Sequence, residues 1–265
     1  MSIIASVHDG LAVIEIARPL KKNALTLDMY DAMADALVAA QADTNVYALV
    51  ITGQPGVFTA GNDLEDFLKR PPGEGAELDQ WPVLRFMRAL LFFGKPIVAA
   101  VTGVAVGIGT TMLLHCDVVY LCEDARLFMP FVKLGLVPEF ASSAILPQLL
   151  GRVRTAEKVL LGEPLTAAEA VGFGLANAAL PAAEVLDHAI RIAQRFKALP
   201  PGAVRDTRKL LRQGASPEAL FETVRREIEV LGRRLHHAEA KEACRAFLEK
   251  READFSRSAR VAPAR

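Results

Sequence analysis

The chain has 265 residues, of which 52% are hydrophobic and 23% are charged. These values exclude a disordered protein and predict a folded, globular one. Lys and Arg together number 31, as do Asp and Glu, so the formal net charge is zero and gives no reason to expect a nucleic acid or an anionic membrane as a partner.

The first half of the chain alternates predicted strands with predicted helices. Apolar runs predict strands over residues 11–17, 46–52, 97–101 and 117–122. Apolar residues recur at four-residue spacing from Met29, which predicts a helix over 26–42 with Thr26 as its N-cap. Residues 69–82 are rich in Gly, Pro and charge and are predicted to form a mobile loop. This alternation indicates an α/β fold.

The segment 96–114 carries no charge and is long enough to raise the question of a membrane span. Its glycines and threonines favour another interpretation. We expect a buried strand over 97–101, a turn at Thr102 and Gly103, and a buried helix after Gly107. No membrane partner is therefore expected.

From Thr155 onward the pattern is helical. Thr166 and Glu169 fit a capping box that opens a short helix. Later helices are expected over 181–199, from Ser216 to about Leu235, and from about Glu239 to Glu252. We expect a core over 1–199 and a C-terminal helical region over 200–265 that makes oligomer contacts.

The cysteines and histidines indicate no disulfide or metal site. Cys116, Cys122 and Cys244 are odd in number and form no C-x-x-C pair, and the first residues lack a basic region followed by an apolar stretch. Reduced thiols in the cytoplasm are therefore predicted. His236 and His237 are adjacent on a predicted helix and point in different directions, so no metal is expected there.

A lone acid, Glu139, lies among apolar residues in the run L-G-L-V-P-E-F-A-S-S. If it is buried, desolvation raises its pKa, which suits a base that takes and returns a proton near neutral pH. Alternatively, it is an exposed loop acid before a helix that begins at Ser142 or Ser143, where a negative charge favours the helix dipole. Both interpretations remain open at this point.

Two glycine-bearing turns precede this acid, at 58–64 and 103–111. Glycine lets the backbone approach a ligand closely, and two N–H groups aimed at one thioester oxygen would stabilise an enolate. The alternative is that these glycines serve only tight turns and helix–strand packing. Lys21 and Lys22 form a basic pair that either contacts phosphates or is ordinary solvated surface.

Four motifs in this order resemble the crotonase superfamily, the enoyl-CoA hydratase/isomerase family. The segments R-P-L-K-K-N-A-L (18–25), F-T-A-G-N-D-L (58–64), G-V-A-V-G-I-G (103–109) and the C-terminal stretch 247–255 look like its coenzyme A loop, its two oxyanion turns and its C-terminal end. The resemblance covers essentially the whole chain. It implies a crotonase-like spiral of ββα turns followed by helices that build a homotrimer, often a dimer of trimers.

The resemblance also implies roles for individual residues. The oxyanion donors would be the amides of Asn62 and Ile108, and the acid/base would be Glu139. Contacts with coenzyme A are implied for a further set of residues: Lys21, Lys22, Ala24, Ala60, Asp63, Leu64 and Lys250. Of these, Lys250 would reach the ligand of a neighbouring subunit. Coenzyme A is part of the acyl-CoA substrate, so no separate cofactor is expected.

Two positions depart from the hydratases of this family. Thr111 and Phe131 stand where those enzymes have the two glutamates that position and activate water, and neither side chain can exchange a proton at neutral pH. The run 130–143 is similar to the Δ3,Δ2-enoyl-CoA isomerase branch, in which the Glu at the position of Glu139 acts alone. Phe140 stands where that branch commonly has Gly, which predicts a narrower acyl pocket or a displaced Glu139.

The resemblance therefore predicts an isomerase that converts a 3-enoyl-CoA into a 2-enoyl-CoA through a dienolate. One alternative is an enoyl-CoA hydratase with an atypical acid pair. Another is an acyl-CoA-binding homologue without catalysis.

Overall fold

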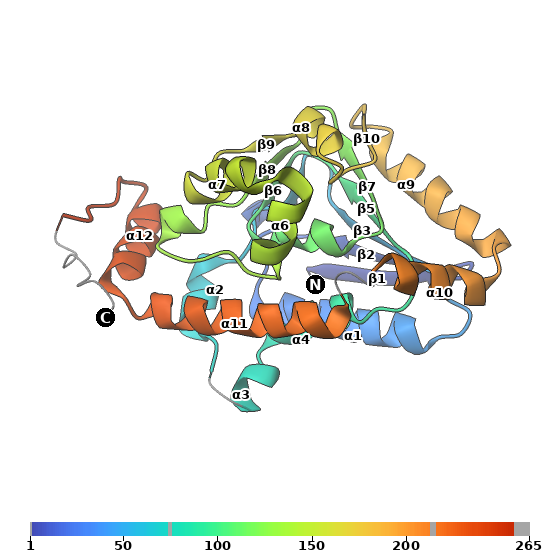
Figure 1. Cartoon of the computed structure of the whole chain (residues 1–265), viewed down its shortest axis with the longest axis horizontal. Helices are drawn as coiled ribbons and strands as arrows, with labels where there is room; N and C mark the ends of the chain where they lie inside the picture. Colours follow the sequence, from blue (N-terminus) through green and yellow to red (C-terminus); the bar gives the residue numbers. More distant parts are fainter. Residues whose placement is uncertain (1, 74–75, 213–215, 257–265) are drawn as a thin grey trace.

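Two β-sheets form the framework of the computed structural model, which describes residues 2–73, 76–212 and 216–256 (Figure 1). The larger sheet has the order β1 (Ile3–His8), β2 (Leu11–Ile16), β3 (Ala48–Gly53), β5 (Ile97–Val101), β7 (Val118–Cys122) and β10 (Ala178–Leu180). The smaller sheet has the order β4 (Val57–Thr59), β6 (Val104–Val106), β8 (Arg126–Phe128) and β9 (Leu165–Thr166). The pairs β1/β2 and β8/β9 are antiparallel, and the other strand pairs are parallel.

Helices cover these sheets and continue to the end of the described chain. The first half contributes α1 (Leu27–Ala42), α2 (Leu64–Lys69), α3 (Ala76–Asp79), α4 (Pro82–Leu91) and α5 (Ile108–Thr111). The second half contributes α6 (Ser142–Leu150), α7 (Arg152–Leu160), α8 (Ala167–Gly172), α9 (Val185–Gln194), α10 (Pro201–Leu211), α11 (Pro217–Leu235) and α12 (Ala238–Glu249). Single 3₁₀ turns lie at η1 (Pro19–Lys21), η2 (Met112–His115), η3 (Val132–Leu134) and η4 (Arg195–Ala198).

The chain passes alternately through the two sheets. β3, β5 and β7 lie in the larger sheet, and each is followed by a strand of the smaller sheet, β4, β6 and β8 respectively. Helices or helical turns then return the chain to the larger sheet after β4 and β6, whereas after β8 the chain first adds β9 to the smaller sheet and then reaches β10. β3 and β5 are buried along their whole length, which explains their continuous apolar sequences. This arrangement confirms the predicted α/β spiral of ββα turns.

The four strands and the N-terminal helix predicted from the sequence are confirmed. Thr26 caps α1 by accepting a hydrogen bond from the Met29 N–H at 3.3 Å. The capping box of Thr166 and Glu169 is formed at α8, and Ser216 caps α11. The uncharged segment 96–114 contains the expected strand, turn and helix, and also a second short strand, β6, that was not expected. None of the helices in the described ranges is long and apolar enough to span a membrane.

Other elements differ from the prediction. The segment 69–82 was predicted as a loop but contains the short helix α3, and its residues 74–75 lie outside the described part. The helix predicted over 181–199 begins only at Val185 and tightens to 3₁₀ geometry at Arg195. The last helix ends at Glu249, three residues early, because Lys250 has a left-handed backbone with φ of 56°.

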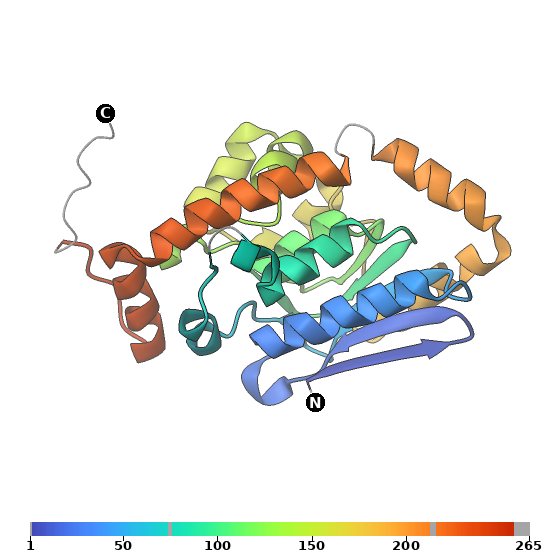
Figure 2. The ribbon, with the colours of Figure 1, turned by 90° about the horizontal axis from the view of Figure 1, so that it is seen from below.

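The C-terminal helices pack against the core. α11 lies beside α4 and crosses the molecule next to it, whereas α12 contacts η3 (Figure 2). The buried face of α11 carries an apolar stripe at helical spacing: Val224, Ile228, Leu231 and Leu235. A single acid, Glu227, is buried on the same helix. The helices α11 and α12 therefore also help to enclose the interior of the protein.

Candidate active site

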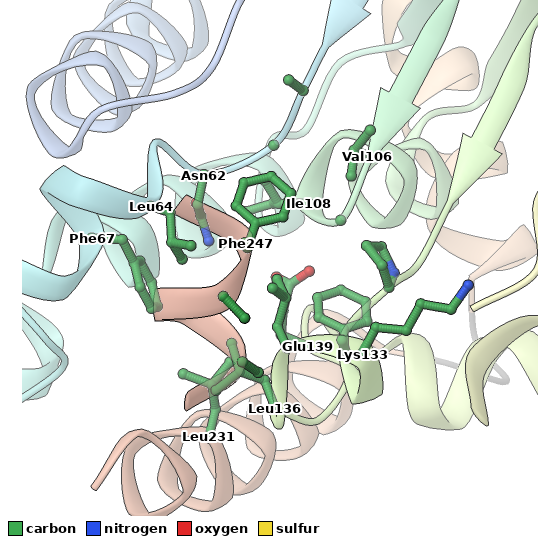
Figure 3. A pocket seen from close by; sticks show the side chains of 18 of the residues that line it. Asn62, Leu64, Phe67, Val106, Ile108, Lys133, Leu136, Glu139, Leu231 and Phe247 are labelled. Atoms are coloured by element: carbon green, nitrogen blue, oxygen red, sulfur yellow. The ribbon is translucent and has the colours of Figure 1, made fainter. Parts of the chain in front are cut away.

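The candidate site lies where three parallel strands of the smaller sheet end. β4, β6 and β8 run in the same direction, so their carboxyl ends meet at one edge, a common place for ligand sites. The residues that follow these strands, 60–62, 107–108 and 130–131, line one cavity of about 350 Å³. Figure 3 shows Glu139 facing the same cavity from below the labelled Asn62 and Ile108.

The first turn depends on a glycine and presents a backbone N–H. Gly61 has φ of +81°, and a Cβ there would lie 2.6 Å from the Val106 carbonyl oxygen. The turn pairs with Leu25, which donates to the Gly61 carbonyl at 2.8 Å and accepts from the Asp63 N–H at 2.8 Å. This parallel bridge uses the neighbours of Asn62, so the N–H of Asn62 itself is turned away from Leu25.

A hydrogen bond from α1 fixes the side chain of Asn62. The Tyr30 hydroxyl donates a hydrogen bond to Asn62 Oδ1, and Tyr30 is completely buried. Burial raises the pKa of Tyr30 well above its ordinary value, so the phenol stays protonated and remains a donor. The first turn is therefore held from α1 as well as from the neighbouring chain segment.

The second turn presents another backbone N–H. Gly107 has φ of 57° and ψ of −120°, a combination available only to glycine, and it is the N-cap residue of α5. Its carbonyl accepts hydrogen bonds from the N–H groups of Thr110 and Thr111 at 2.9 and 3.0 Å. The first helical residue, Ile108, has no acceptor within the helix for its N–H. Both predicted oxyanion residues thus border the cavity.

Glu139 is buried, with 3% of its surface exposed. Its Oε1 accepts a hydrogen bond from the Thr111 hydroxyl at 2.6 Å, whereas its buried Oε2 has no hydrogen-bond partner among the described residues. Burial raises the pKa of Glu139 to about 8; the Thr111 hydrogen bond opposes this rise and the charge of Glu227 adds to it. Glu139 is therefore not an exposed loop acid, although α6 does begin at Ser142.

The raised pKa predicts that Glu139 destabilises the fold at high pH. The carboxyl group stays protonated in the folded chain up to about pH 8 but ionises near pH 4.5 when unfolded, so wild-type stability falls between these values. Glu139→Gln does not titrate, and we expect it to gain on the order of 3 kcal/mol over wild type between pH 5 and pH 9. Urea unfolding at both pH values measures this difference. An unchanged difference at the two pH values would refute the prediction.

Phe140 does not narrow the cavity. Its buried ring stacks on His115, with centroids 4.0 Å apart, and meets Phe86 edge-on at 6.1 Å. The His115 Nε2 lies 2.8 Å from the Phe140 carbonyl oxygen, and burial lowers the pKa of His115 to about 4, so this ring is a neutral donor. The unusual feature of Phe140 is its backbone, which has φ of 59° where glycine is favoured.

The residues assigned to coenzyme A divide into two groups. Ala60 and Leu64 line the cavity together with Asn62, Ile108 and Glu139. The others do not line it: Lys21, Lys22, Ala24, Asp63 and Lys250. The two lysines are exposed, and the Lys22 carbonyl accepts a hydrogen bond from the Ala60 N–H at 3.0 Å, so the basic loop adjoins the first turn.

Asp63 has a structural partner. Its Oδ2 lies 2.7 Å from Arg18 Nη1, and its other oxygen accepts from the Asp66 N–H at the start of α2. Burial raises the pKa of Asp63, but the hydrogen bonds from Arg18 and Asp66 outweigh that effect and hold it below its ordinary value. Asp63 thus joins the N-terminal basic loop to the helix after the first turn.

Much of the cavity wall comes from residues that no sequence motif indicated. Apolar side chains come from α2, the segment after β8, α11 and α12: Phe67, Leu134, Leu136, Leu231, Ala243, Ala246 and Phe247. Two cations also line the cavity: Lys133, whose Nζ lies 3.2 Å from the Gly162 carbonyl, and Arg251, paired with Glu242 at 2.6 Å. The apolar residues of α11 recur at helical spacing, which indicates that one face of the helix is buried but not which cavity that face lines.

The spiral of ββα turns, with two glycine-held amides opposite one buried acid, defines a protein of the crotonase class. The chain belongs to the enoyl-CoA hydratase/isomerase family, whose model matches residues 6–258.

Relatives within the family have different named reactions. The chain is 34% identical to human enoyl-CoA delta isomerase 2 over 80% of its length and 54% of that protein, and it thus spans about half the length of this protein and of its rat counterpart. It is 30% identical to a probable enoyl-CoA hydratase of Bacillus subtilis over 96% of its length and 98% of that protein. The structure of Pseudomonas aeruginosa OdaA matches with a TM-score of 0.89 and 48% identity, covering 93% of this chain and 98% of that one.

Proposed function

We propose that the protein is an acyl-CoA isomerase that moves the double bond of a 3-enoyl-CoA to the 2-position. One observation carries this proposal: among the described residues that line the cavity, Glu139 is the only one with a carboxyl group. The two-acid route of water addition needs a second carboxyl group beside the substrate. Thr111 and Phe131 occupy the positions of the two hydratase glutamates, and neither side chain exchanges a proton at neutral pH. A double-bond shift needs a single proton carrier.

In this mechanism the thioester oxygen accepts hydrogen bonds from the N–H groups of Asn62 and Ile108. Glu139 takes the proton from C2, and the electron pair of that C–H bond becomes part of a dienolate spread over the thioester and the C3–C4 double bond. The two N–H groups stabilise the charge that develops on oxygen. Protonated Glu139 then returns the proton to C4, and the conjugated 2-enoyl-CoA forms.

Thr111 and the surrounding apolar residues determine which oxygen reacts and how strong a base it is. Because the Thr111 hydroxyl occupies Oε1 of Glu139, the unpartnered Oε2 is the oxygen that receives the proton. Burial raises the pKa of Glu139 to about 8, which makes its carboxylate a stronger base than an exposed one. The same group remains acidic enough to protonate C4.

We further propose that coenzyme A lies along the basic loop beside the first turn, with Lys21, Lys22 and Ala24 near its phosphates. We also propose a homotrimer or a dimer of trimers assembled through the C-terminal region. The partly exposed apolar side chains of this region support that assembly: Phe247, Leu248 and Phe255. A cytoplasmic location stays a prediction.

The reaction type can be tested with two substrates. Purified protein is expected to convert a 3-enoyl-CoA into its conjugated isomer, followed by absorbance, with kcat/KM at least about 100-fold above that for water addition to a 2-enoyl-CoA. Chromatography of the products separates the 2-enoyl-CoA from a 3-hydroxyacyl-CoA. Comparable rates of the two reactions would instead indicate a hydratase. Acyl-CoA binding without turnover of either substrate would indicate a non-catalytic homologue.

A further inference from the structure

The turn that follows Glu139 has an unusual backbone. Phe140 and Ala141 have φ of 59° and 56°, so two consecutive residues with side chains adopt the left-handed conformation. Such a turn persists only when its surroundings hold it. The N–H and the hydroxyl of Ser142 both donate to the Glu139 carbonyl, at 3.2 and 2.6 Å, so the backbone of Glu139 is tied to this turn.

A side chain from α11 holds the turn in place. Ala141 occupies the N-cap position of α6 but has no side-chain oxygen to accept the free N–H groups. The Glu227 carboxylate accepts hydrogen bonds from the Ala141 N–H at 2.6 Å, from the Ser143 N–H at 3.0 Å, and from the Ser143 hydroxyl. A negative charge at the start of a helix is also favoured by the helix dipole. Glu227 thus caps α6 from a distant part of the chain.

The hydrogen bonds of the Glu227 side chain within the described part of the chain all go to the turn and to the start of α6. It is 8% exposed and lies on the face of α11 that buries Val224 and Ile228, where a carboxylate without hydrogen bonds is unfavourable. No ion pair to Glu227 occurs within the described part of the chain. Burial raises the pKa of Glu227, and the hydrogen bonds from Ser143 and Ala141 oppose that rise. Its hydrogen bonds with these groups therefore all serve the turn.

We propose that Glu227 is a positioning residue for Glu139. Through the left-handed turn, it fixes the direction from which the Glu139 carboxyl group faces C2 and C4 of the acyl group. Its negative charge also lies close enough to Glu139 to make loss of the Glu139 proton less favourable. This inference rests on the proposed function of Glu139.

The groups that face Glu139 come from several elements: Thr111 on α5, Tyr30 on α1, Glu227 on α11, and the cavity-lining Lys133 and Arg251. Thr111 does not titrate, and Tyr30 stays neutral because burial raises its pKa. Lys133 and Arg251 are retained in every variant compared below. A change in the titration of Glu139 after replacement of Glu227 therefore reports the lost charge or a moved turn.

The test compares Glu227→Gln and Glu227→Asp with parent protein. Gln has the same size as Glu but no charge, and its NH₂ group replaces an oxygen that accepts a hydrogen bond from the turn. We therefore expect kcat for isomerisation to fall about 10- to 100-fold with little change in KM. The rising limb of the kcat/KM pH profile is expected to move to lower pH. Asp keeps the charge but is one methylene shorter, so kcat falls while that limb stays in place. Glu229→Gln, an exposed acid on the same helix, is the matched control and leaves both unchanged.

A second readout does not depend on turnover. The protonated carboxyl stretch of Glu139 in infrared spectra, assigned by its loss in Glu139→Gln, is expected to titrate at lower pH in Glu227→Gln than in the parent. If Glu227→Gln only lowers the melting temperature, with kcat per folded molecule and both pH midpoints unchanged, Glu227 is merely structural and the inference is wrong. Normal turnover in Glu139→Gln would instead refute the proposed function.

Discussion

Glu139→Gln is expected to reduce kcat for isomerisation of a 3-enoyl-CoA by about 10³-fold, the middle of the range for a positioned proton carrier. The amide has nearly the same shape and can accept the Thr111 hydrogen bond through its oxygen, but it cannot take a proton from C2. Substrate contacts with the two turns remain, so KM should change little. The measurement is the initial rate of formation of conjugated product at saturating substrate.

A matched control separates this effect from a general loss of charge. Glu157 is an exposed acid on α7 and is not among the cavity-lining residues, so Glu157→Gln should keep parental kcat. The fold of Glu139→Gln is checked by its expected gain in stability at high pH. Turnover within a factor of about three of the parent in a folded Glu139→Gln protein would exclude Glu139 as the base.

Gly61→Ala should cause the second large loss, about 10²-fold or more in kcat. The new Cβ would lie 2.6 Å from the Val106 carbonyl oxygen, which is backbone and cannot rotate away, so the first turn has to move. The N–H of Asn62 then no longer points at the thioester oxygen. Because this donor acts mainly on the charge of the transition state, kcat should fall more than KM rises.

Gly56→Ala is the matched control for this substitution. Gly56 also has a positive φ, +89°, but a Cβ there meets no heavy atom within 4 Å. It therefore carries a backbone penalty of about 1 kcal/mol without a steric clash. We expect Gly56→Ala to lower the melting temperature and to leave kcat unchanged. Equal losses of kcat in both variants would show that backbone strain alone, and not the displaced donor, affects the reaction.

Local sequence signals were sufficient for the two turns and for β2, β3, β5 and β7, but not for the other six strands of the described chain. β3 and β5 are short apolar runs, and Gly61 and Gly107 mark backbone conformations that other residues avoid, so each can be identified within a few positions. Helix boundaries that depend on caps, such as Thr26 and Ser216, were predicted for the same reason. These features involve neighbours in sequence.

Features that depend on distant contacts could not be predicted. The helix α11 contacts the turn beside Glu139 and lines the same cavity, but it begins more than seventy residues later, and nothing near Glu139 in the sequence encodes that packing. Phe140 gives no sign of a left-handed backbone, because its sequence neighbours are compatible with an ordinary loop. The packing of its ring against His115 and Phe86 helps to explain why the conformation is retained. The contribution of Leu231 to the cavity likewise depends on where a helix crosses the core.

The origin of the cavity wall has a consequence for how this protein could diversify. The proposed proton carrier and the two proposed oxyanion amides come from segments between residues 60 and 139, whereas Leu231, Ala243 and Phe247 come from the last helices. Exchanges at the latter positions can fit longer, branched or aromatic acyl tails and leave the reacting atoms untouched. The range of acyl groups that such a fold accepts can thus change independently of the reaction it catalyses, provided that Glu227 keeps its hydrogen bonds to the turn beside Glu139.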